Sequence, residues 1–267
     1  MAVDDIVLVG CGNMGGAMLQ GWVAQGRALA LTVIDPALDR VPDGVRGLQA
    51  VPVGAVPADV LVLAVKPQML AVVAPAIRAL TGPDTILLSI LAAVEIATLR
   101  AHFPAVKAVV RAVPNLPASI GAGVTALAAE ALGEAGVALV TELCRPLGQV
   151  VWLDNEAQID AATSVSGCGP AFLFRFADAV VRAGMAQGLD ATQARQLFAA
   201  TMVGAGKMLM AGNESPGEMA RRVASPGGVT LAGLSVLDHD DALVRLVSDT
   251  LAAAGVRSAE MAAETRR

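Results

Sequence analysis

The sequence contains no tyrosine, few other aromatic residues and little positive charge. Aromatic residues make up 3% of its 267 residues, and the formal net charge is −5. Proteins that bind nucleic acids use basic patches, and those that bind single strands add aromatic rings for base stacking. Lysines and arginines do not cluster anywhere in this sequence. We therefore do not expect a nucleic acid among its partners.

Cysteine and histidine are also scarce. Cys11, Cys144 and Cys168 are widely separated, and His102 and His239 are the only histidines. An odd number of cysteines without C-x-x-C spacing predicts free thiols in a cytoplasmic protein, with no disulfide framework and no metal site.

Long apolar runs are missing as well, although hydrophobic residues make up 55% of the chain. A membrane-spanning helix needs about 20 consecutive apolar residues, and charged residues such as Asp59, Arg78 and Asp84 interrupt the longest candidates. No basic segment precedes the first apolar run. We therefore expect neither a membrane span nor a signal peptide.

Short apolar runs alternate with helical stretches through the first 155 residues. Runs that are apolar on both faces are typical of buried strands in a parallel sheet covered by helices. The expected strands are 6–10, 31–35, 60–65, 85–90, 107–113, 123–128 and 149–153, and the expected helices are 14–25, 69–80, 94–102 and 130–146. This alternation predicts an α/β fold with an N-terminal Rossmann-type doubly wound sheet.

The pattern changes after Asp154, and only helices are expected from there on. They lie near 156–164, from 169 to 187, from 190 to 209, and near 217–223, 228–238 and 240–264. We therefore predict a dinucleotide-binding domain at 1–155 and an all-α domain at 156–267. A small apolar helical domain often completes its core by dimerising, so we expect the second domain to form the dimer interface. Its polar loop at 224–230 also makes it the expected substrate-binding domain.

The segment Gly10–Gly15 matches the pattern G-x-G-x-x-G directly between an expected strand and an expected helix. In this context Gly10 allows a tight turn, Gly12 lets the backbone approach a pyrophosphate, and Gly15 lets helix and strand pack closely. The start of the helix offers free N–H groups to the same phosphates. The pattern therefore predicts a bound dinucleotide.

Asp35 ends the second expected strand, 20 residues after Gly15. An acid at this place usually accepts hydrogen bonds from the adenosine ribose, and its charge repels a 2′-phosphate. Asp35 therefore favours NADH. NADPH stays open, because Arg40 is near enough in sequence to reach a phosphate.

Two stiff turns follow further strands and are expected at the ligand-facing edge of the sheet. The first is Ala64-Val65-Lys66-Pro67, where Lys66 either contacts the cofactor or is simply solvated. The second is 111–117, where Asn115 stands between two prolines. Its amide either bonds the nicotinamide or substrate, or serves only the turn.

A polar, glycine-rich loop at 224–230 directly precedes an expected helix. Its backbone N–H groups can hold a carboxylate, with help from the Ser225 and Thr230 hydroxyls. A plain helix cap would need only one Ser or Thr. The chain also lacks a catalytic His or a Ser-His-Asp pattern, which suits reduction of an imine, since a protonated C=N group is already electrophilic.

These motifs together resemble the pyrroline-5-carboxylate reductase family over nearly the whole chain. The matching segments are Gly10–Met18, Val65-Lys66-Pro67, Pro114-Asn115, Ser166–Ala171, and above all Ser225-Pro226-Gly227-Gly228-x-Thr230 followed by Leu237-Asp238. The family usually has Tyr where this chain has Phe172. The nearest match to an acid that often precedes the last motif is Glu214.

The resemblance implies NAD(P)H-dependent reduction of L-1-pyrroline-5-carboxylate to L-proline, the last step of proline biosynthesis, by hydride transfer to the C=N carbon. It implies Thr230 as the catalytic residue at the ring nitrogen, and a substrate site made of Val223, Ser225, Gly227, Gly228 and Thr230. The implied cofactor-binding residues are Gly10, Gly12, Asn13, Met14, Gly15, Asp35, Ala64, Val65, Lys66, Pro67 and Asn115. It further implies a homodimer through interleaved C-terminal helices, with a ring of five dimers as the larger assembly.

Two other functions stay open from the residues. A reductase of the β-hydroxyacid dehydrogenase type would need a lysine on the interdomain helix, whereas the one lysine after residue 107 is Lys207. A non-catalytic NAD(P)-binding regulator would not need the complete motif at 225–230.

Overall fold

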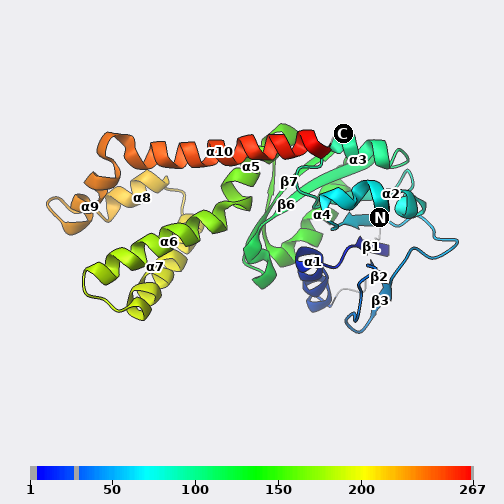
Figure 1. The fold of residues 1–267 in the computed structure, drawn as a ribbon, viewed down its shortest axis with the longest axis horizontal. Coiled ribbons are helices and arrows are strands. Elements are labelled where there is room, and N and C mark those ends of the chain that lie inside the picture. Colours follow the sequence, from blue (N-terminus) through cyan, green and yellow to red (C-terminus); the bar gives the residue numbers. More distant parts are fainter. Residues whose placement is uncertain (1–4, 27–29, 266–267) are drawn as a thin grey trace. The chain divides into compact units, whose positions relative to one another are not determined.

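The computed structural model describes residues 5–26 and 30–265 and divides into two compact units (Figure 1). The first unit joins Met1–Cys168 to Ala254–Arg267, and the second is Gly169–Ala253. By its contacts, the first unit thus includes the short helix α5 (Ile159–Ala162), the π-helical turn Thr163–Gly167 and the end of the last helix. The domain boundary predicted at residue 155 rests on composition and stays a prediction.

The first unit is built on one eight-stranded sheet, which confirms the predicted Rossmann-type α/β fold. The strand order is β3-β2-β1-β4-β5-β6-β7-β8, and β6 and β7 form the one antiparallel pair of this sheet. The strands are β1 (Asp5–Val9), β2 (Ala30–Ile34), β3 (Val45–Leu48), β4 (Val60–Leu63), β5 (Ile86–Ser89), β6 (Ala108–Pro114), β7 (Gly123–Glu130) and β8 (Gly148–Trp152). The order reverses between β1 and β4, and ligands of open α/β sheets bind at such a switch point.

Strand β3 was not expected from the sequence. It is a short edge strand in which exposed Arg46 and Gly47 interrupt the apolar pattern, so periodicity could not reveal it. The other strands agree with the expected runs to within a few residues.

Helices cover both faces of the sheet because alternate strand residues point to opposite sides. One buried cluster joins Ile6 and Leu8 of β1 to α1 (Asn13–Ala24) and α4 (Glu134–Cys144). The other joins Val7 and Val9 to α2 (Leu70–Ile77) and α3 (Ile96–His102). The core is largely aliphatic, as the scarcity of aromatic residues requires.

The second unit is helical, as predicted. It holds α6 (Gly169–Ala186), α7 (Ala191–Ala211), α8 (Pro216–Arg222), α9 (Val229–Leu237) and the first part of α10 (Ala242–Thr265). Asp190 begins α7 with a capping box, in which its carboxylate accepts a hydrogen bond from the backbone N–H of Gln193. None of the helices in the described ranges is long and apolar enough to cross a membrane.

Much apolar surface of this second unit is exposed in a single chain. On α6, Leu173 is 57% exposed and Phe174 59%, and on α10 Leu246 is 66% exposed. An apolar groove of about 550 Å³ runs between α6 and the first part of α10. A monomeric protein rarely leaves so much contiguous apolar surface in water.

Candidate functional site

The glycine-rich loop between β1 and α1 has a shape that two of its glycines make possible. Gly10 has φ +95°, and a Cβ there would lie 2.7 Å from the carbonyl oxygen of Ala64. A Cβ on Gly15 would collide with the carbonyl oxygen of Gly10. Gly10 and Gly15 are therefore required by the packing of the loop itself.

Gly12 is different, because the protein gives it no internal neighbour. A Cβ at Gly12 would meet no atom within 4 Å, and its backbone (φ −71°, ψ −164°) is one that any residue adopts. Packing therefore does not explain this glycine. It leaves open space at the N-terminus of α1, where the N–H groups of the first turn have no partner in the helix. This cradle fits a phosphate group.

Asp35 follows β2 and connects it to the glycine-rich loop. One carboxylate oxygen accepts a hydrogen bond from the N–H of Cys11 at 2.7 Å, and the other accepts one from the N–H of Ala37 at 2.8 Å. The negative charge is therefore fixed beside the glycine-rich loop.

Cys11 lies within the same loop. Burial, and then the nearby Asp35 carboxylate, raise the pKa of its thiol. At neutral pH the thiol is protonated and is a poor nucleophile. All three cysteines are free, and the described ranges contain no group of three His, Cys, Asp or Glu side chains that could hold a metal ion.

The turn after β4 lies beside the glycine-rich loop. Ala64 donates a hydrogen bond to Val9 of β1 at 2.8 Å, and this contact joins the two strand ends. Lys66 is exposed at this edge, and Pro67 begins a 3-10 turn directly after it. The structure thus brings Ala64 and Val65, two of the predicted residues 64–67, next to Gly10 and Gly15.

Asn115 is 9% exposed and connects three segments. Its side-chain oxygen accepts a hydrogen bond from the N–H of Val124, and its amide nitrogen donates one to the carbonyl oxygen of Ser166, each at 3.0 Å. Both ends of the amide therefore hold the end of β6 against β7 and the π-helical turn.

A cavity of about 370 Å³ lies within the first unit next to the glycine-rich loop. Its walls come from the loop between β5 and α3 (residues 90–95, called the β5–α3 loop), the end of β6, the π-helical turn and the last turns of α10. The lining residues are Met14, Ile90, Ala92, Ala93, Arg111–Pro114, Thr163, Cys168, Ala254, Arg257, Ser258 and Met261. Of these, only Met14 was among the predicted site residues.

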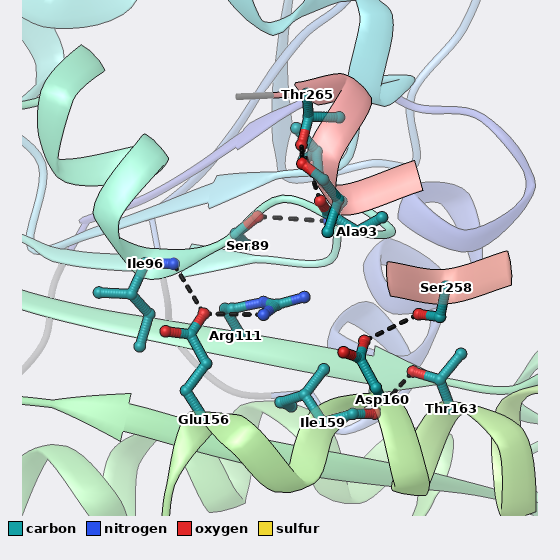
Figure 2. Close-up of polar contacts among 12 residues, drawn as sticks. Ser89, Ala93, Ile96, Arg111, Glu156, Ile159, Asp160, Thr163, Ser258 and Thr265 are labelled. Atoms are coloured by element: carbon teal, nitrogen blue, oxygen red, sulfur yellow. Dashed lines mark hydrogen bonds and ion pairs between the residues drawn. The ribbon is translucent and has the colours of Figure 1, made fainter. Parts of the chain in front are cut away.

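Sequence reasoning also missed an ion pair between Arg111, a buried residue that lines this cavity, and the partly exposed Glu156. Arg111 has a side chain that is 7% exposed, and its guanidinium lies 2.7 Å from Glu156 Oε1. The same oxygen accepts a hydrogen bond from the N–H of Ile96, also at 2.7 Å (Figure 2). The sequence did contain a signal for this pair, since Arg111 is a charged residue inside the apolar strand 107–113. A buried charge requires a partner of opposite charge or hydrogen bonds.

The predicted anion-binding loop lies in the second unit and precedes α9. Gly227 has φ +70°, a conformation that favours glycine, and a Cβ on Gly228 would lie close to Ser225, 3.0 Å from its carbonyl oxygen, so the turn is tight at both positions. The first helical hydrogen bond of α9 is the one that the N–H of Ala232 donates to the carbonyl oxygen of Gly228. The N–H groups of residues 229–231 precede this bond and have no acceptor within the helix.

Thr230 is exposed at this helix start, and α9 has no side-chain cap. Val223, at the end of α8, is 61% exposed.

Glu214 forms an ion pair with Arg222 at 2.8 Å. Glu218 forms a capping box with Ser215, and hydrogen bonds from the Ser215 hydroxyl and N–H lower the pKa of its carboxyl. Glu214 and Glu218 are therefore engaged within their own segment.

Two family models match the chain. One is described as pyrroline-5-carboxylate reductase dimerisation and matches residues 156–261. The other is described as NADP oxidoreductase, coenzyme F420-dependent, and matches residues 5–93. The second match covers the glycine-rich loop, Asp35 and the turn after β4, and agrees with a nicotinamide dinucleotide as cofactor.

Individual relatives match over almost the full chain. Pyrroline-5-carboxylate reductase of Pseudomonas aeruginosa is 36% identical over 98% of this chain and 98% of its own length. That of Escherichia coli is 32% identical over 88% of this chain and 90% of its own. The structure of the enzyme from Coxiella burnetii superposes with a TM-score of 0.90 at 30% identity, covering 97% of this chain and 98% of that chain. This chain belongs to the pyrroline-5-carboxylate reductase family.

Proposed function

We propose that this protein reduces L-1-pyrroline-5-carboxylate to L-proline with a reduced nicotinamide cofactor, as the last step of proline biosynthesis. The single observation that carries the proposal is the loop before α9, where two glycines, the Ser225 and Thr230 hydroxyls and three N–H groups with no backbone partner among the described residues stand together. Such a loop suits a carboxylate joined to a polar ring. The cytoplasmic location expected from the sequence is part of the same proposal.

In this proposal the loop at 225–230 binds both polar groups of the substrate, the carboxylate and the ring nitrogen. The N–H groups at the start of α9 and Ser225 hold the carboxylate, with Val223, Gly227 and Gly228 completing the site. The Thr230 hydroxyl bonds the ring nitrogen, where it stabilises the protonated imine and then the amine. Orientation against the cofactor supplies much of the remaining rate enhancement.

The residues of the first unit fit the cofactor at its phosphates and its ribose. The pyrophosphate binds at Gly12 and at the first turn of α1, which contains Asn13, Met14 and Gly15. The Asp35 carboxylate accepts hydrogen bonds from the hydroxyls of the adenosine ribose. Residues 64–67 border the same edge of the sheet. The bound reduced nicotinamide supplies the hydride. Asn115 contributes by holding the end of β6, because both ends of its amide are already engaged.

Cofactor oxidation in the presence of L-1-pyrroline-5-carboxylate tests the function directly. We expect the loss of absorbance at 340 nm to depend on the substrate and to yield proline in equal amount. The same assay with a β-hydroxyacid and oxidised cofactor is the control. Turnover of the hydroxyacid without turnover of the imine would overturn the proposal.

We further propose that Asp35 favours NADH over NADPH. Replacing Asp35 by serine should raise the ratio of kcat/KM with NADPH to that with NADH by about tenfold or more, because like charges about 4 Å apart repel by about 1–4 kcal/mol near a protein surface. Asp35→Asn is the matched control, since it keeps the shape and an acceptor for the N–H of Cys11 while removing the charge. If paired measurements find the same ratio of kcat/KM in both variants as in the unmodified protein, the Asp35 carboxylate does not discriminate between the two cofactors.

The exposed apolar face of α6 and α10 supports a homodimer through these helices, and the match described as dimerisation covers the same residues. A decamer built from five dimers is the larger assembly that we propose. Burying the exposed groove-lining side chains Leu173, Phe176 and Leu246 in a partner contributes about 25 cal/mol per Å² of apolar surface.

Light scattering should therefore find no stable monomer at micromolar concentration. Leu246→Glu places a charge on the apolar face, so the variant should either halve the dimer mass or unfold, whereas Leu246→Met, with similar volume, should keep the dimer. A folded monomer of the unmodified protein at micromolar concentration would refute this assembly.

A further inference from the structure

The β5–α3 loop contains a residue in an unfavourable backbone conformation. Ala93 has φ +59°, in the left-handed region, although it is not a glycine. This conformation costs an ordinary residue about 1–2 kcal/mol, so the surrounding structure must support it. Ala93 is also 9% exposed and lines the cavity beside Ala92.

The last turn of α10 supplies that support from far away in the sequence. Thr265 Oγ1 lies 2.9 Å from the carbonyl oxygen of Ala93 and 2.9 Å from that of Ala262, so its single proton is shared between them (Figure 2). Ala93 lies 172 positions before Thr265 in the chain. The hydroxyl thus ties the cavity-lining loop to the end of α10.

Three further contacts hold the two segments that Thr265 connects. Glu156 holds the far end of the β5–α3 loop through the N–H of Ile96 and is itself paired with Arg111. On the helix side, Ser258 donates a hydrogen bond to the Asp160 carboxylate at 2.8 Å, which fixes α10 against α5. Figure 2 shows these contacts around the loop. The Thr265 hydroxyl therefore acts between two anchored segments.

We propose that Thr265 is a positioning residue for the cofactor, acting through Ala93 and the β5–α3 loop. The proposal rests on the proposed function, because it takes the cavity beside Met14 as the place where the nicotinamide end binds. Without the hydroxyl, the loop can relax from its left-handed conformation, and the fraction of protein with a competent cavity falls. The apparent affinity for the cofactor falls by the same fraction.

Binding of NADH and NADPH, followed by cofactor fluorescence without substrate, tests this idea separately from turnover. Thr265→Val should raise the Kd about three- to tenfold, the effect of one lost hydrogen bond. The KM for the cofactor should rise similarly, while kcat at saturating cofactor stays within twofold. Thr265→Ser is the matched control, because it keeps the hydroxyl, and it should bind as the unmodified protein does.

Ala93→Gly in the Thr265→Val background is the decisive variant. Glycine adopts a positive φ without steric cost, so the second change should return the Kd to within about twofold of the unmodified value. A role of Thr265 in helix stability alone would lower Tm and would not be rescued at position 93. If Thr265→Val melts markedly earlier, Thr265→Ala, which lacks the β-branch, carries the same test.

The inference is overturned if Thr265→Val binds both cofactors within twofold of the unmodified protein, or if Ala93→Gly fails to restore binding. Failure of the proposed function gives a different result. In that case the unmodified protein binds neither cofactor, or it binds one without reducing the imine.

Discussion

Replacing Thr230 by valine is expected to lower kcat/KM for the imine by about 10- to 150-fold. The estimate follows from the loss of one hydrogen bond to a charged partner, which costs about 1.5–3 kcal/mol. Valine has nearly the same volume, and Thr230 lies exposed at the first turn of α9, so the fold should survive. The affinity for NADH should change little, because the cofactor residues lie in the other compact unit.

Thr230→Ser is the control for this experiment, since it keeps the hydroxyl and should retain most of the activity. If kcat/KM of a folded Thr230→Val protein falls by less than about threefold, another group binds the ring nitrogen. Ser225 would then be the next candidate. Unfolding of the variant, detected by circular dichroism, would instead make Thr230 a structural residue of the helix start.

Replacing Gly12 by alanine should reduce kcat/KM for the cofactor by about 100-fold, the size of effect that follows from displacing a bound group by about 1 Å. The added methyl would stand in the space at the start of α1 that we assign to the pyrophosphate. Because a Cβ there meets nothing within 4 Å and the backbone angles suit any residue, the thermal stability should fall only by the small cost of alanine in place of glycine at the helix N-cap. Loss of binding with a nearly unchanged Tm would therefore report on the ligand alone.

Gly16→Ala is the matched control, four positions later on α1. Its Cβ would make only an ordinary contact, 3.9 Å from the carbonyl oxygen of Cys11. Alanine is a better helix former than glycine by about 1 kcal/mol, so this variant should bind normally and melt no earlier. Normal cofactor binding by Gly12→Ala would show that the cradle is not used for the pyrophosphate.

Local patterns were sufficient to predict most of the fold. Buried strands such as 60–65 are continuous apolar runs, and the glycine-rich segment at 10–15 marks the turn into α1. Strand β3 could not be predicted, because Arg46 and Gly47 interrupt its pattern and its pairing with β2 is a property of the assembled sheet. Periodicity describes the surroundings of a residue only along its own element.

The candidate site was predictable to the extent that its residues lie in local motifs. Ala64 and Val65 follow β4 at the expected edge of the sheet, where they meet the glycine-rich loop. The cavity walls formed by Arg257, Ser258 and Met261 were not predictable, because they come from a helix that starts in the other unit and carry no motif. Asn115 was predicted as a site residue, and its two hydrogen bonds depend on long-range contacts that the sequence does not encode locally.

The return of α10 to the first unit has a consequence for how the chain folds during synthesis. Residues 254–265 complete a unit that begins with β1, yet they are translated only after all of residues 169–253. Domains generally fold in the order in which they leave the ribosome, at about 5–20 residues per second. The nucleotide-binding sheet can therefore form early, whereas the end of α10, which holds Ala93 through Thr265, is synthesised many seconds later. A nascent chain stalled before residue 254 should hold a folded sheet with an unfinished cavity.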